Sequence, residues 1–149
     1  LFKQRDTFID FEKLTHGPVS GHTKSLTKKQ IKTIKALFQK AIRTIAYPKT
    51  GGFLQKAELT WGEESTQGNK ANVELNLWVE SEDLETDITF HWFQTKKGWK
   101  LIDMSFDGAS LVKDYQNQFG KIIAKDGGAS LVNKLETRLS EAQKKYGKS

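Results

Sequence analysis

The chain has 149 residues, of which 36% are apolar, 28% charged and 11% aromatic. A chain of this length can bury roughly 70% of its unfolded surface, which is enough for a stable core without cross-links. The absence of cysteine excludes disulfides, thiolate metal sites and cysteine nucleophiles. No apolar run approaches the ~18 residues needed to cross a bilayer. The sequence therefore predicts a single domain over residues 1–149 that is not membrane-spanning.

The net charge of +6 is distributed unevenly along the chain. Residues 13–57 hold ten basic and no acidic side chains, whereas residues 58–107 hold four basic and eleven acidic ones. The basic segment is either a solvated helix face or a docking surface for acidic proteins or anionic lipid headgroups. Nucleic acid is not an expected partner, because the segment has one arginine and no exposed aromatic platform. The candidate docking residues are Lys28, Lys32, Lys35 and Arg43.

Two helices are predicted before the first strand. Phe8, Phe11 and Leu14 have helical spacing, and Gly17-Pro18 is expected to end that first helix. A second helix begins at Thr27, where the Thr-x-x-Gln pattern is typical of a capping box, and its apolar positions continue to Ile45. We expect Pro48 and Gly51-Gly52 to end it.

From residue 54 to 107 the apolar period changes from that of a helix to two, as expected for strands with one buried face. Residues 73–79, 88–92 and 99–106 show this alternation clearly, and residues 57–61 show it more weakly. Turn-forming residues separate the runs at 62–70, 81–85 and 96–98, so the sequence predicts a four-stranded antiparallel meander.

Two more amphipathic helices are predicted after the sheet. The pentapeptide Gly-Ala-Ser-Leu-Val occurs at 108–112 and again at 128–132, and apolar residues with helical spacing follow each copy. The serine of each copy is expected to cap its helix. The fold class is thus α+β, an antiparallel sheet wrapped by amphipathic helices.

No catalytic or metal-binding constellation is expected. His16 and His22 lack the further ligands that zinc requires, and His91 lies on the polar side of its strand, where a solvated or hydrogen-bonded role is expected. Asp103 is the carboxylate nearest the apolar side chains, but uninterrupted alternation places it on the other face from Met104, together with Leu101. Trp99 and Ser105 are expected on that same side.

The stretch from Trp99 to Val112 carries a family resemblance. It reads Trp-Lys-Leu-Ile-Asp-Met-Ser-Phe-Asp-Gly-Ala-Ser-Leu-Val and is followed by Tyr115, Gln118 and Phe119. A Trp, a strand with one Asp, a Gly-x-Ser-Leu-Val helix start and Tyr-x-x-Gln-Phe resemble the carboxy-terminal half of the MlaC family, the periplasmic phospholipid-binding or toluene-tolerance proteins. The first half of the chain resembles the family less closely. The family usually carries more helix there, so the resemblance implies truncated amino-terminal helices.

The resemblance implies that the sheet and helices surround an apolar cavity, in an MlaC-like fold similar to the NTF2-like architecture. It implies a periplasmic phospholipid carrier that needs no cofactor and performs no chemistry on its cargo. It further implies two partners, an inner-membrane ABC transporter complex with a MlaD-like subunit and an outer-membrane MlaA-like lipoprotein. Our site hypothesis places acyl chains between a sheet floor and helical walls. The floor residues are Leu75, Leu77, Phe90, Trp92, Met104 and Phe106, and the wall residues are Ile42, Ile45, Val112, Tyr115 and Phe119.

Two alternatives remain open from the residues alone. One is a small acid–base enzyme of similar architecture, for which Asp103 and His91 are the candidate titrating groups. The other is an interaction domain that carries nothing and whose apolar faces pack solid.

Overall fold

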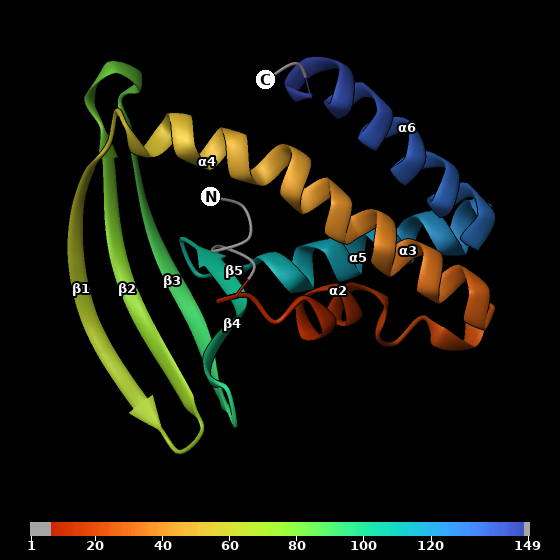
Figure 1. Cartoon of the computed structure of the whole chain (residues 1–149), viewed down its shortest axis with the longest axis horizontal. Helices are drawn as coiled ribbons and strands as arrows, with labels where there is room; N and C mark the ends of the chain where they lie inside the picture. The colour runs from red at the N-terminus through yellow and green to blue at the C-terminus, as the bar shows by residue number, and fades with distance from the viewer. Residues whose placement is uncertain (1–6, 148–149) are drawn as a thin grey trace. The chain divides into compact units, whose positions relative to one another are not determined.

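Five antiparallel strands form one sheet in the order β1-β2-β3-β4-β5 (Figure 1). The computed structural model describes residues 7–147. The α+β class and the antiparallel meander predicted from the sequence are confirmed, whereas the predicted number of four strands is wrong. The strands are β1 (Glu58–Gln67), β2 (Lys70–Val79), β3 (Leu84–Thr95), β4 (Gly98–Phe106) and β5 (Ala109–Ser110).

The strand that the sequence did not predict, β5, has two residues and is too short to show a period. Asp107 and Gly108 both have positive φ values, 49° and 84°, and reverse the chain directly after β4. The next two residues therefore pair back onto β4, with Ala109 opposite Phe106 and Ser110 opposite Ser105.

Strand β1 is longer than its apolar residues indicate. Residues 62–67 were predicted to be a turn because they are polar, but they continue the strand, and the turn is at Gly68. All ten β1 residues are exposed, so this edge strand is held mainly by its backbone pairing with β2. A bulge lies between Trp61 and Glu64, where Gly62 approaches Glu74 so closely that an added Cβ would come within 3.0 Å of the Glu74 Cβ.

A second bulge lies in β4 and corrects the predicted alternation. His91 of β3 pairs with Asp103, but Trp92 pairs with Leu101, so Ile102 is an extra residue in β4. Leu101 and Trp99 therefore lie on the face opposite Asp103, contrary to the prediction from strict period two.

The helices are α2 (Phe11–Val19), η1 (Thr23–Ser25), α3 (Lys28–Ala41), the π-helix η2 (Ile42–Ala46), α4 (Tyr47–Leu54), the 3₁₀ turn η3 (Glu80–Glu82), α5 (Leu111–Asp126) and α6 (Gly128–Tyr146). The capping box that begins α3 is confirmed, because Thr27 Oγ1 accepts from the Gln30 N–H and Gln30 Oε1 accepts from the Thr27 N–H. No helix within residues 7–147 combines the length and the apolar content required to cross a membrane.

The prediction that Pro48 and Gly51-Gly52 end the second helix is wrong. The chain continues through η2 and α4 as one rod to Leu54 (Figure 1). In η2 the Tyr47 N–H bonds to the Ile42 carbonyl, one residue further back than in an α-helix. This widened turn directly precedes Pro48, whose ring would clash with the carbonyl four residues earlier in a regular α-helix.

Two other helix boundaries differ from prediction. The first helix begins after Asp10, whose side chain accepts from the Lys13 N–H, so Phe8 precedes it; the helix then continues through Gly17-Pro18 to Val19. The Ser110 cap of α5 is confirmed by its bond from the Lys113 N–H, but Ser130 lies inside α6. Gly127, with a φ of 84°, precedes α6 instead.

The described chain divides into two compact units, each built from two stretches. The sheet unit comprises residues 1–14 and 53–114, and its core contains Leu75, Leu77, Val79 and Ile88. The helical unit comprises residues 15–52 and 115–149. Its core residues come from α2, α3, α5, α6 and the segment before α3: Val19, Leu26, Ile34, Phe38, Phe119, Ile123, Leu131 and Leu135.

Candidate functional site

One face of the sheet gathers large apolar side chains from neighbouring strands. Leu75 pairs with Ile88 and Ile88 with Phe106, while Phe90 pairs with Met104. Directly paired residues point to the same face of an antiparallel sheet, so these side chains form one surface. All six predicted floor residues lie on this surface, which we call the apolar face.

The apolar face is buried at its centre and open at its margin. Leu75 and Leu77 are 4% and 1% exposed, and Phe53, Ala57, Phe90 and Met104 pack against the core to which they belong. Phe90, Trp92 and Met104 are half-buried. Phe106 remains 39% exposed. Apolar side chains of this size that stay in water as a group indicate a surface that another apolar molecule can cover.

Two residues of β1 and two of β4 extend this face beyond the predicted set. Leu59 pairs with Leu77 and Trp61 with Leu75, and they are 42% and 64% exposed. The Trp61 ring centroid lies 6.4 Å from that of Phe90. The sequence shows the weak alternation of Leu59 and Trp61, but this alternation predicts only a strand and not a binding site. Leu101 and Trp99 join the face because of the β4 bulge, which no sequence period reveals.

The predicted wall residues have different surroundings. Phe119 is buried within the helical core, and Ile42 and Tyr115 pack against that core. Tyr115 and Phe119 flank Phe38, with ring centroids 4.8 Å and 5.6 Å from it in edge-to-face geometry. Ile42 and Ile45 both lie in η2 and are half-buried. Val112 is half-buried at the start of α5 in the sheet unit. That these side chains touch a lipid remains a prediction.

The opposite face of the sheet carries a hydrogen-bonded polar group. His91 is held at both ring nitrogens, with Nδ1 2.8 Å from Asn72 Oδ1 and Nε2 2.7 Å from Ser105 Oγ. Ser105 is 7% exposed. The hydrogen-bonded role expected for His91 is confirmed, and the arrangement satisfies a buried hydroxyl group.

Asp103, the carboxylate considered for acid–base chemistry, accepts hydrogen bonds at the start of α5. Its Oδ1 accepts from the N–H groups of Met104 and Val112, at 2.8 Å and 3.1 Å, and its Oδ2 accepts from Ser110 Oγ at 2.5 Å. A carboxylate at a helix N-terminus is stabilised by the free N–H groups of the first turn. The side chain therefore joins β4, β5 and α5.

The two loop histidines also have separate surroundings. His16 is exposed in α2, whereas His22 Nε2 lies 2.9 Å from the Gln116 carbonyl of α5. Gly120 makes room for the His22 ring, because a Cβ there would lie 2.6 Å from its Cε1 atom. Among residues 7–147 no group of three or more histidine, aspartate or glutamate side chains could hold a metal ion.

The predicted docking residues divide into two pairs. Lys28 and Lys32 are exposed on α3. Lys35 and Arg43 are half-buried, and each makes an interaction of its own within the protein.

The fold has a counterpart among solved structures. The phospholipid-binding protein from Ralstonia solanacearum, solved in complex with a phospholipid, superposes with a TM-score of 0.72 over 91% of this chain and 75% of the other, at 19% identity. A de novo designed β-sheet protein matches 46% of this chain and 78% of its own, at 16% identity and a TM-score of 0.33. No curated protein sequence matches the chain.

The family resemblance read from Trp99 onward extends over most of the chain. A model of the family described as MlaC protein matches residues 1–137, which includes both compact units almost completely. The chain belongs to the MlaC family.

Proposed function

We propose that this protein binds phospholipid and carries it through the periplasm between an outer-membrane MlaA-like lipoprotein and an inner-membrane ABC transporter complex with a MlaD-like subunit, both units serving this one function. The observation that supports the proposal most is the apolar face, whose margin leaves Leu59, Trp61 and Phe106 in water. Membership of the MlaC family and the phospholipid held by the Ralstonia protein of the same fold support it further.

The energetics of the cargo favour a carrier that works by contact with membranes or membrane proteins. A phospholipid has roughly 30 acyl CH₂ groups, and each is worth about 0.8 kcal/mol when it leaves water. Release into water is therefore negligible. A bilayer offers nearly the same transfer free energy as an apolar protein surface, so modest contacts at the donor or acceptor decide whether lipid is loaded or released.

The acid–base enzyme alternative is less well supported. Its candidate groups, His91 and Asp103, lie on the face opposite the apolar one, and their polar atoms are engaged by Asn72, Ser105 and Ser110. Acyl chains covering the apolar face would not meet either group. We therefore propose binding without chemical change.

Native mass spectrometry of the chain purified from a Gram-negative host tests the proposal. We expect a phospholipid adduct on the wild-type protein. Trp61→Gln should weaken its retention roughly tenfold, because it removes an exposed ring from the apolar face. A bulky replacement of Leu75 would be a poorer test, since Leu75 is 4% exposed and the sheet itself would be disturbed.

The matched control is Trp78→Gln, which makes the same change on the opposite face of the neighbouring strand. Circular dichroism of both variants verifies that they fold. A wild-type protein without phospholipid would contradict the proposed function, and equal retention in the two variants would contradict the assignment of the apolar face.

A further inference from the structure

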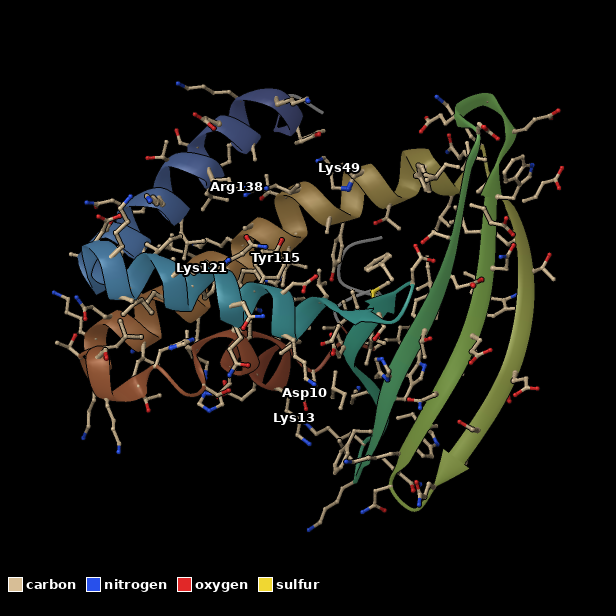
Figure 2. The ribbon with its side chains drawn as sticks, turned by 180° about the vertical axis from the view of Figure 1, so that it is seen from behind. Asp10, Lys13, Lys49, Tyr115, Lys121 and Arg138 are labelled. Atoms are coloured by element: carbon tan, nitrogen blue, oxygen red, sulfur yellow. The ribbon has the colours of Figure 1, made fainter. Side chains whose placement is uncertain are left out.

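The division into two compact units separates the charges of the chain more sharply than the sequence order does. The helical unit contains fifteen Lys or Arg and three Asp or Glu residues, a net charge of +12. The sheet unit contains nine basic and fifteen acidic residues, a net charge of −6. Figure 2 shows the same contrast, with nitrogen-tipped side chains such as Lys121 and Arg138 on the helices and many oxygen-tipped ones along the strands.

Helix α3 concentrates this positive charge on one side. Lys28, Lys29, Lys32 and Lys40 are exposed, and the 3.6-residue period places them opposite Ile34 and the other apolar positions that enter the helical core. The helix contains no acidic residue, and neither does the whole stretch 15–52. No ion pair neutralises these four lysines within the part of the chain that the structure describes.

We propose that this lysine side of α3 binds the surface of an anionic phospholipid bilayer. The inference rests on the proposed carrier function and adds the surface through which the protein reaches its lipid source. Charge complementarity identifies the partner: the lysines have no opposing carboxylates of their own, and a lysine near an anionic membrane surface strengthens binding about fivefold. Several lysines on one side of a helix can contact a flat surface at the same time, and each contributes its own roughly fivefold increase in affinity.

The probe for this surface is a set of lipid vesicles that differ only in headgroup charge. Co-sedimentation is measured with phosphatidylcholine alone and with phosphatidylcholine containing phosphatidylglycerol. The full chain is expected to bind the anionic vesicles and to dissociate as sodium chloride is raised, because salt screens exposed charges. The double variant K28E/K32E should bind at least about 25-fold more weakly, since two of the fivefold factors are lost.

The chain offers a matched control in the other unit. Lys96 and Lys97 are exposed in the turn between β3 and β4, so K96E/K97E makes the same charge change on the sheet unit. This variant should retain wild-type binding to anionic vesicles. Equal weakening in both variants would show that only total charge matters and would overturn the proposal. So would equal wild-type binding to neutral and anionic vesicles.

The adduct measurement on wild-type protein separates this inference from the proposed function. A chain that carries phospholipid but does not bind anionic vesicles would overturn the membrane-binding surface and leave the proposed function standing. A chain that binds the vesicles through Lys28 and Lys32 but carries no phospholipid would uphold this surface and contradict the carrier function.

Discussion

At the scale of single residues, Asp103 does more for the fold than its position in a strand suggests. Its two carboxylate oxygens accept from Val112 N–H and Ser110 Oγ, so it fixes the point where β5 becomes α5. The sequence marked Asp103 as an isolated acid between apolar neighbours. Its partners could not be predicted, because they depend on the reversal at Asp107 and Gly108 that brings β5 back beside β4.

Replacing Asp103 should therefore destabilise the protein in a graded way. Asp103→Ala removes the acceptor for both hydrogen bonds to α5 and its cap, and we expect the free energy of unfolding to fall by about 2–3 kcal/mol. Asp103→Asn keeps one acceptor oxygen but loses the charge at the helix N-terminus, so a loss of about 1 kcal/mol is expected. Urea denaturation followed by circular dichroism measures both. Losses below about 0.5 kcal/mol for Asp103→Ala would refute the capping role.

At the scale of elements, the sequence predicted what local periodicity encodes. The capping box at Thr27 correctly predicted the start of α3. The alternation in β2, β3 and the last residues of β4 correctly predicted that the six floor residues share one face of the sheet. The parts that were missed depend on neighbours in space. The polar half of β1 forms a strand because its backbone pairs with that of β2. Leu101 pairs with Trp92 because the bulge in β4 contains one extra residue.

The end of α4 shows how local signals are overridden. Pro48 and Gly51-Gly52 are strong helix terminators, yet the helix continues to Leu54. The wider π-helical turn η2 before Pro48 accommodates the proline ring. The glycines remain at a cost of up to about 1 kcal/mol each relative to alanine. Replacing these glycines with alanine should remove this cost.

Gly51→Ala and Gly52→Ala should each stabilise the protein by about 0.4–1 kcal/mol. Both glycines are helical, and an added Cβ would meet no atom within 4 Å. Gly120→Ala in α5 is the opposing test, because its Cβ would lie 2.6 Å from the His22 ring and force it to move. We expect thermal midpoints to rise for the first two variants and to fall for the third. A fall for Gly52→Ala would mean that α4 is not helical at that position.

At the scale of the whole molecule, folding places two basic stretches that are far apart in the sequence in one compact unit. The basic stretch 15–52 shares a compact unit with residues 115–149, which are also basic overall. A unit with a net charge of +12 repels itself, and such repulsion lowers the stability of the folded state at low ionic strength.

Sodium chloride should therefore stabilise the helices. Raising its concentration shortens the Debye length from about 30 Å at 0.01 M to about 8 Å at 0.15 M, and we expect the thermal midpoint measured at 222 nm to rise by roughly a few degrees. Lys40→Gln, which removes one exposed charge from α3, should raise the midpoint at low salt and reduce the salt effect. A midpoint that falls with added salt would show that attractive charge pairs outweigh the repulsion.

The bulges in β1 and β4 lie on either side of the β2–β3 pair and bend the strands that carry the apolar face. Each adds one residue to its strand, and the residues beyond it therefore change face relative to strict alternation, as Leu101 does. Deleting Ile102 or Glu63 would remove the extra residue and should flatten the sheet, while the paired side chains of the apolar face stay on that face. Changes of length at these two points would therefore alter the curvature of the apolar face without substituting any residue on it.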